Sequence, residues 1–134
     1  MSIRTAVRAA VIASWSVLAA CSAPAPVHVP DGQTYLTSTQ PYDGDLKAFA
    51  SQVTIGTVLA HPGAKLLSSL PFPGCPAMGG LATYVLPKAS PPAVMLVGFT
   101  VLHGSSTTAT YTRPKNAPPD PGITTAMHSV ICQV

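Results

Sequence analysis

Proline is the residue that most restricts how this chain can fold. The 134 residues include fifteen prolines, and a proline fits neither a helix interior nor a central strand. Most of them gather in three groups, within residues 24–30, 71–76 and 114–121. We interpret the first group as an extended tether, the second as a stiff elbow and the third as a loop. Regular structure is therefore expected in the segments between them.

The clearest expected element is a strand over residues 93–103, followed by a turn and a helix near the C-terminus. Apolar residues alternate along this strand and the positions between them are also largely apolar, so we expect it to be covered on both faces. Gly104-Ser105-Ser106 predicts a turn into a threonine-rich partner strand over residues 107–112. Asp120 followed by Pro121 predicts a helix N-cap, although a final strand over residues 123–132 stays open. In the expected helix, one apolar face would be shared by Ile123, Met127, Val130 and Ile131.

Shorter elements are expected earlier in the chain. Residues 33–39 and 81–86 read as strands, and Asp45 could cap a short helix over residues 46–52. Val53, Ile55 and Leu59 then indicate a strand, and residues 65–70 indicate either helix or turn. No internal repeat is present. The expected fold is therefore α+β, with a small antiparallel sheet, one or two short helices and one disulfide in a single domain over residues 33–134.

The N-terminal segment has the pattern of an export signal. Arg4 and Arg8 precede an uncharged apolar stretch over residues 9–20. As a helix this stretch is about 18 Å long, too short to cross roughly 30 Å of hydrocarbon, and it fits a signal peptide. The run Leu18-Ala19-Ala20-Cys21 resembles the lipobox of bacterial lipoproteins. A plain secretory signal followed by a coincidental cysteine is the alternative.

The lipobox resemblance implies a lipid anchor on Cys21. It divides the chain into a cleaved signal peptide over residues 1–20, a lipidated proline-rich tether over 21–32 and the domain that follows. Acyl chains such as palmitate would hold the protein on a membrane. Ser22 after the cysteine implies the outer membrane, facing the periplasm, if the host is Gram-negative. Without the signal the chain has a net charge of +1, which predicts no nucleic-acid partner. The residues counted are Lys47, Lys65, Lys88, Arg113 and Lys115 against Asp31, Asp43, Asp45 and Asp120.

Two cysteines remain once Cys21 is lipidated. An exported chain lies in an oxidising compartment, so Cys75 and Cys132 are expected to form a disulfide. Closing a loop across their sequence separation would remove on the order of 4 kcal/mol of entropy from the unfolded chain. A redox or metal-binding thiol pair is the alternative, but neither a Cys-x-x-Cys motif nor a neighbouring histidine supports it.

No motif in the sequence predicts a reaction. No two of the histidines, His28, His61, His103 and His128, lie within ten residues of each other, which leaves no local metal motif. Folding could still bring His103 and His128 together. A Gly-x-Ser-x-Gly motif is absent from the sequence, and Asp43 and Asp45 flank Gly44 in an expected capping turn. We therefore expect a protein that is not an enzyme, with no cofactor and no metal site.

The C-terminal half also resembles the C-terminal domain of TonB-type energy-transducing proteins. The residues that carry the resemblance are the elbow Pro71-Phe72-Pro73, the strand residues Val97, Phe99 and Val101, the turn residue Gly104 and Ala126 in the last expected helix. The family's basic helix before the strand and its final strand have no counterpart here. The resemblance implies protein recognition in the periplasm, without energy transduction.

These patterns lead to two hypotheses about function. The first is a non-catalytic, lipid-anchored envelope protein that acts as an interaction or accessory module for another envelope protein. It would use an exposed edge of the threonine-rich strand through Thr108, Thr110 and Thr112, because an edge strand presents unpaired backbone groups. The alternative is a lipoprotein that binds a small ligand or a metal in a pocket beneath the proline elbow.

Overall fold

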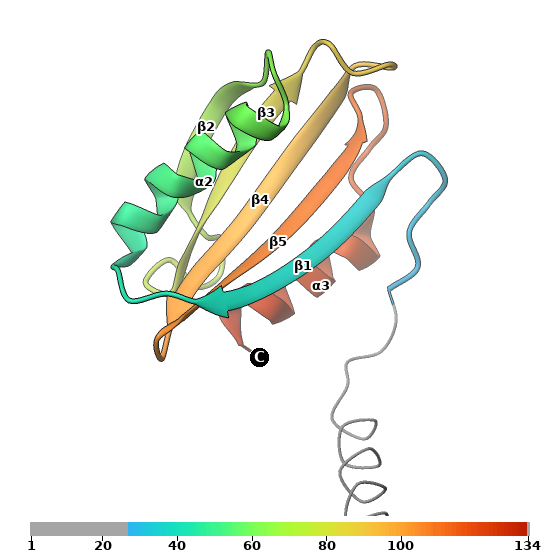
Figure 1. Cartoon of the computed structure of the whole chain (residues 1–134). Coiled ribbons are helices and arrows are strands. Elements are labelled where there is room, and N and C mark those ends of the chain that lie inside the picture. Colours follow the sequence, from blue (N-terminus) through green and yellow to red (C-terminus); the bar gives the residue numbers. More distant parts are fainter. Residues whose placement is uncertain (1–26, 134) are drawn as a thin grey trace, which may run out of the picture.

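The structure, a computed structural model, describes residues 27–133. They form one five-stranded antiparallel sheet with the strand order β1-β5-β4-β3-β2 and two helices (Figure 1). This confirms the expected α+β class. The signal peptide, the lipobox with Cys21 and the first part of the tether lie outside the described residues. The elements are β1 (Thr34–Pro41), α2 (Leu46–Ala60), β2 (Lys65–Pro71), β3 (Gly79–Leu86), β4 (Ala93–Leu102), β5 (Ser105–Pro114) and α3 (Pro121–Cys132).

The predicted hairpin is present as β4 and β5. Leu102 pairs with Ser105 across the two-residue turn His103-Gly104, whose residues have φ values of 53° and 74°. Positive φ at both central positions gives a turn whose twist matches that of the two strands. The turn therefore lies one residue earlier than predicted, and β5 begins at Ser105.

Helix α2 is longer than predicted. The Asp45 carboxylate caps it, accepting a hydrogen bond of 2.7 Å from the Ala48 backbone N–H. The helix then continues to Ala60, so the strand predicted from Val53, Ile55 and Leu59 is wrong. β-branched residues lower helix propensity, but Phe49, Val53 and Thr57 recur every four residues and pack on the sheet. Tertiary packing outweighs local propensity here.

Strand β2 corrects a second prediction, because residues 65–71 form neither a helix nor a turn. They pair antiparallel with β3, with a bulge between Leu66 and Ser68. This pairing is non-local, and residues 65–70 do not alternate cleanly between apolar and polar, so the segment alone lacked a strand signal. β2 is one free edge of the sheet and β1 is the other.

Helix α3 answers the question left open for the C-terminal segment. It begins at Pro121 after Asp120, whose carboxylate accepts the Ile123 backbone N–H at 3.0 Å. The predicted apolar face is correct, since Ile123, Met127 and Ile131 are buried against the sheet and Val130 is half-buried. The helix cap and the apolar periodicity thus agree with the packing.

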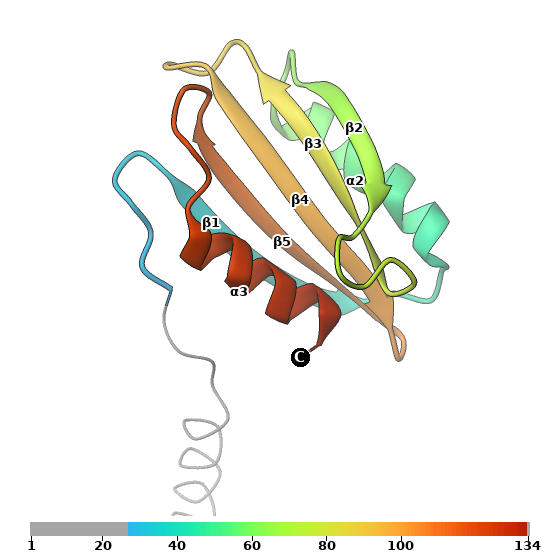
Figure 2. The ribbon, with the colours of Figure 1, turned by 180° about the vertical axis from the view of Figure 1, so that it is seen from behind.

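The two helices lie on opposite faces of the sheet (Figures 1 and 2). Helix α2 packs on β3 and β4, whereas α3 packs on the other face over β4 and β5. Each helix therefore covers only part of its face. Among the described elements, none covers the α2 side of β5 and β1 or the α3 side of β2 and β3, and these two open areas define the candidate sites.

Candidate functional site

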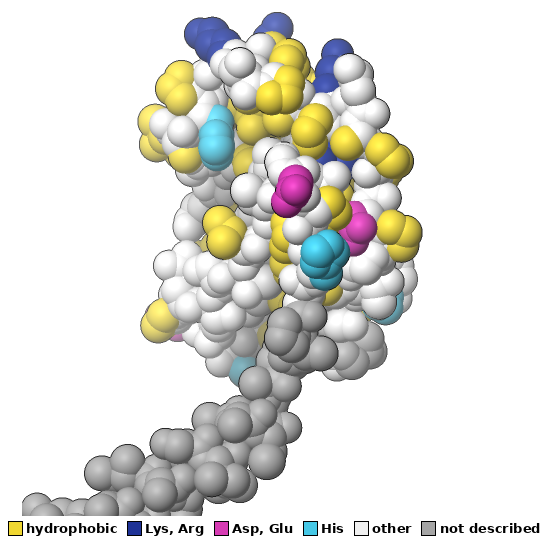
Figure 3. All heavy atoms as spheres, turned by 90° about the vertical axis from the view of Figure 1, so that its right-hand side faces the viewer, with side chains coloured by type: hydrophobic (Ala, Val, Ile, Leu, Met, Phe, Trp, Pro, Cys, Tyr) yellow, Lys and Arg dark blue, Asp and Glu magenta, His cyan; other side chains and the backbone are white. Residues whose placement is uncertain are grey.

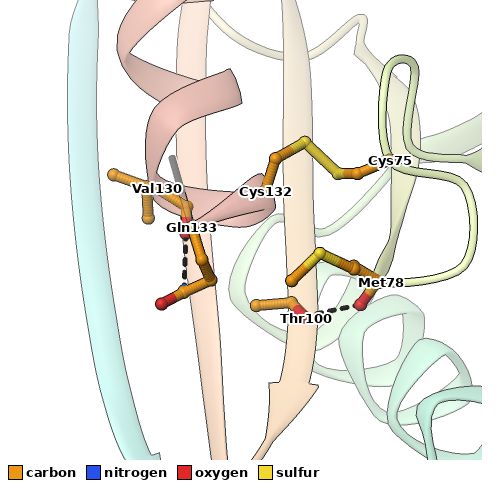
Figure 4. The surroundings of a disulfide bond; sticks show 6 residues. All are labelled: Cys75, Met78, Thr100, Val130, Cys132 and Gln133. Atoms are coloured by element: carbon orange, nitrogen blue, oxygen red, sulfur yellow. Dashed lines mark hydrogen bonds between the residues drawn. A yellow bond between two sulfur atoms is a disulfide. The ribbon is translucent and has the colours of Figure 1, made fainter.

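The predicted disulfide between Cys75 and Cys132 is present (Figure 4). The two Cα atoms are 5.6 Å apart, and the bond joins the proline elbow to the last turn of α3. Beside it, the Thr100 hydroxyl donates a hydrogen bond of 2.6 Å to the Met78 carbonyl oxygen. The elbow is therefore fixed to both the sheet and the helix.

Close packing under α3 depends on Gly98 in β4. A Cβ atom at this position would lie 2.8 Å from Cε2 of Phe72 and 3.1 Å from Cγ1 of Ile131. Phe72 is buried in the elbow with an exposed fraction of 5%. The absence of a side chain at Gly98 thus lets the elbow and α3 meet over the same strand.

The threonine strand is not an edge strand, which corrects the basis of the predicted partner site. β5 pairs with β4 on one side and with β1 on the other, so its backbone groups take part in two ladders. The edge strand is β1. Thr108, Thr110 and Thr112 remain partly exposed and lie on the α2 side of the sheet, so any contact they make with a partner is through side chains.

Thr108 and Thr110 line a groove between β5 and helix α2. Phe49, Val53 and Val97 contribute apolar groups to it, and Gln40, Gln52 and His61 contribute polar ones, with no carboxylate, ammonium or guanidinium group among its lining residues. Beside the groove, on the same face of the sheet, Leu36 of β1 is exposed. This open area presents mainly hydroxyl and amide groups.

The other open area, on the α3 side, carries more apolar side chains, although the pair Ser68 and Thr83 also lies on it. The register places Leu70 opposite Leu81, and Val85 opposite Val94. Because directly paired residues of antiparallel strands share a face, these side chains form one surface with Leu96. We call this surface the apolar strip, and its members are Leu70, Leu81, Val85, Val94 and Leu96.

The walls of the apolar strip come from helix α3 and from the proline elbow. Helix α3 forms one side through Thr124, Met127 and His128, and Phe72 and Pro73 of the elbow close one end. These residues enclose a hollow of about 230 Å³ with Leu81 and Leu96. This hollow lies beside the proline elbow, the region in which the ligand-binding hypothesis expects a pocket.

Cations gather at the other end of the strip. Lys65 pairs with Val85, and Arg113 pairs with Val94 on the same face. Lys65 and Lys115 also line one hollow with Val85. In Figure 3 the Lys and Arg side chains lie mainly at the top of the molecule, the end at which β4 begins. We call this the basic end, and its members are Lys65, Lys88, Arg113 and Lys115.

Large aliphatic side chains are exposed on helix α2 and on strand β2. Leu59 of α2 has an exposed fraction of 77% and Leu67 of β2 one of 62%. Among the described residues, every exposed large aliphatic side chain except Leu36 comes from α2 or β2. We call the part outside the apolar strip the aliphatic surface, and its members are Ile55, Val58, Leu59, Leu66 and Leu67.

The histidines do not form a cluster. His103 lies in the β4–β5 turn, and His128 lies on the side of α3 that faces the elbow, with its ring centroid 6.4 Å from that of Phe72. Among residues 27–133 no group of three histidine, cysteine or acidic side chains could hold a metal ion. Asp45 and Asp120 both act as helix caps.

Tyr35 of β1 has a buried hydroxyl group with no hydrogen-bond partner among the described residues. Burial raises the pKa of this phenol above its usual value of 10.0. Val27, Val29 and Val130 line a hollow beside it, between β1 and α3. The N-terminal segment therefore enters on the β1 side of α3, and the apolar strip lies on the other side of that helix.

Sequence reasoning missed the apolar strip and the aliphatic surface for one reason. Leu81, Val94 and Leu96 could be assigned to strands, but their shared face with Leu70 depends on β2 being a strand. The leucines at positions 66, 67 and 70 were the available signal, but a spacing of four residues also fits a helix.

Comparison with known proteins does not name a family for this chain. No family model matches it, no curated protein matches it, and no solved structure matches it. In the part of the chain that the structure describes, neither helix is long and apolar enough to cross a membrane.

Proposed function

We propose that this chain is a lipid-anchored protein of the bacterial envelope that acts as a non-catalytic interaction module for another envelope protein. The anchor is proposed from Leu18-Ala19-Ala20-Cys21, which follows the charged and apolar parts of an export signal. The disulfide between Cys75 and Cys132 supports export, because such bonds persist in oxidising compartments. Metabolic labelling with a palmitate analogue, compared between the native chain and Cys21→Ser, tests the anchor directly.

The observation that carries the interaction is the aliphatic surface. Exposed apolar side chains are common one at a time, but a group of them on one side of a small domain is typical of an interaction site. Ile55 and Leu59 lie away from the face of α2 that packs on the sheet, and their exposed fractions are 60% and 77%. A protein partner would remove this apolar area from water, which is the main favourable term in association.

The position of β2 strengthens the proposal. β2 is a free edge of the sheet, and an apolar edge strand left uncovered pairs readily with other chains. The bulge after Leu66 and the terminal Pro71 limit this pairing. Leu67 and Leu70 nevertheless remain exposed there, so a partner that covers this side removes the hazard.

Leucine substitutions on the aliphatic surface and on the opposite edge strand test the proposal. In cells that carry the full-length lipoprotein, Leu59→Gln and Leu67→Gln should each reduce cross-linking to the partner, because a polar group replaces an apolar contact. Leu36→Gln is the matched control, since Leu36 is 70% exposed on the opposite edge strand. Equal cross-linking yields from the three variants and the native protein would exclude the aliphatic surface as the contact.

The hollow beneath the elbow favours a second candidate function, the binding of a small apolar ligand. It is lined almost entirely by apolar groups of Phe72, Leu81, Leu96 and Met127. Ligand pockets are commonly of this character. Native mass spectrometry of protein released gently from membranes should show a retained ligand if this function holds, and a mass equal to that of the lipidated chain if it does not.

A further inference from the structure

We infer that the apolar strip binds one amphipathic α-helix of the partner protein, lying beside α3 with acidic residues in its C-terminal turn at the basic end. This inference rests on the proposed function and names the class of structure that the partner presents. Three observations support it: the width of the strip, its chemical contrast with the other open area, and the placement of the cations.

The strip has the width of one helix. At the elbow end it spans β2, β3 and β4, and neighbouring strands lie about 4.8 Å apart, so it is roughly 10 Å across there. Farther along, its β2 side is formed by Ser68 and Lys65. A helix with its side chains is about 10 Å in diameter. From Leu81 to Val85 the strip runs about 13 Å along β3, which a helix of about three turns would cover. On the opposite face, α2 covers β3 and β4 in the same manner.

The chemical contrast between the two open areas indicates which of them requires a cover. On the α2 side, β5 presents Thr108, Thr110 and Thr112, whose hydroxyl groups can bind water. On the α3 side, Leu81, Leu96 and Val94 are apolar and only half-buried, and Leu70 beside them has an exposed fraction of 57%. The α3 side therefore gains far more from an apolar occupant.

The described residues that precede β1 do not fill the strip. Val27 and Val29 pack on the β1 side of α3, against Tyr35 and Val130. The strip lies on the other side of the helix, where Met127 and His128 face it. We assign the occupant to a partner protein.

The cations orient the occupant. Lys65 and Arg113 flank Val85 and Val94 on the strip's face, and Lys115 lies at the same end. A helix C-terminus carries partial negative charge, which nearby cations stabilise, and acidic side chains in its last turn add to this attraction. The bound helix would run toward the basic end, whereas α3 runs away from it, so the two helices would lie antiparallel.

Site-directed photo-cross-linking in cells tests the inference on the full-length lipoprotein. A benzophenone amino acid replaces Thr83, which lies opposite Leu96 in the middle of the strip, or Thr110 on the opposite face as a matched control. The cross-linked peptide is then identified by mass spectrometry. The expected result is one partner segment with apolar residues at helical spacing and acidic residues at its C-terminal end, captured from position 83 and not from position 110.

Charge reversal provides a second readout. Lys65→Glu should lower the cross-linking yield from position 83 by at least about fivefold, because it places like charge against the acidic turn. Lys47→Glu, in the first turn of α2, is the control and should leave the yield within about twofold. An unchanged yield in Lys65→Glu would overturn the inference.

The cross-link products also separate the inference from the function on which it rests. The same benzophenone amino acid is also placed at positions 59 and 67 of the aliphatic surface. Capture of a partner from these two positions, with nothing captured from position 83, retains the interaction module and overturns the helix site. Absence of a protein product from all three positions overturns both. Capture of a strand-forming segment, a lipid or a small molecule from position 83 overturns the inference of a bound helix. Capture of a small molecule also supports the ligand-binding function.

Discussion

Removal of the disulfide should lower the free energy of unfolding by about 4 kcal/mol. The bond closes a loop with a sequence separation of 57 residues, which contains β3, β4, β5 and most of α3. The chain-entropy relation gives about 14 cal/mol/K for a loop of this length, or about 4 kcal/mol at 298 K. Small domains have a total stability of about 5–15 kcal/mol, so this one bond supplies a large share.

Urea denaturation of the soluble chain that starts at Ser22 measures this effect. The Cys75→Ala/Cys132→Ala variant is compared with the native protein, oxidised and reduced. Alanine is chosen because Cys132 has an exposed fraction of only 5%, and serine would bury an extra hydroxyl group. The reduced native protein is the control that keeps both sulfur atoms in place.

The two forms without the disulfide should retain native secondary structure in the absence of urea. The Phe72 backbone N–H still donates to the Gly79 carbonyl oxygen at 2.9 Å, and Thr100 still holds the Met78 carbonyl. A loss of stability below about 1 kcal/mol in both forms would refute the reasoning. It would mean that the unfolded chain already keeps the elbow near α3, so that the disulfide has little entropy to remove.

Four further substitutions test individual positions by thermal and urea denaturation of the same chain. Tyr35→Phe should be neutral or stabilising by up to about 1 kcal/mol at pH 7, because it removes a buried unpaired hydroxyl. The pKa of the Tyr35 phenol is raised in the folded state, so the unfolded chain loses the phenol proton first as the pH rises through 10.0. The native protein therefore loses stability there, and the stability difference in favour of Tyr35→Phe should widen. A stability difference that does not change with pH contradicts this. Asp120→Ala removes the N-cap of α3 and should lower stability by about 1 kcal/mol, and an unchanged melting temperature would show that Pro121 alone defines the helix start. Gly98→Ala should lower stability by about 1–3 kcal/mol through overpacking, whereas Gly56→Ala, with no atom within 4 Å of the added Cβ, should raise it by up to about 1 kcal/mol.

Elements with local signals could be predicted from the sequence. The β4–β5 hairpin has a strand of alternating apolar residues and a glycine in its turn, and α3 has Asp120 and Pro121 at its start. The disulfide followed from the two cysteines that remain in a chain expected to be exported. In each case the deciding interactions lie close together in sequence, or depend on composition and compartment rather than on topology.

Elements that depend on distant partners could not be predicted in the same way. Helix α2 contains Val53, Thr54 and Ile55, whose β-branched side chains favour a strand, and only packing on β3 and β4 makes this segment helical. The site assignment failed for a related reason. Thr110 was assigned to an edge because nothing in the sequence shows that β1 adds to β5 instead of to another strand.

The arrangement of two helices on a five-stranded sheet has a consequence for function. Each face can hold two helices side by side, yet each holds one among the described elements, and the two vacant areas differ in chemistry. A polar vacancy such as the surface of Thr108, Thr110 and Thr112 is stable in water because its hydroxyl groups remain hydrated. An apolar vacancy such as the surface of Leu81 and Leu96 has no such compensation, and its burial by a partner would add to the stability of both proteins. The apolar uncovered area, on the α3 side, is therefore where we place the helix of the partner.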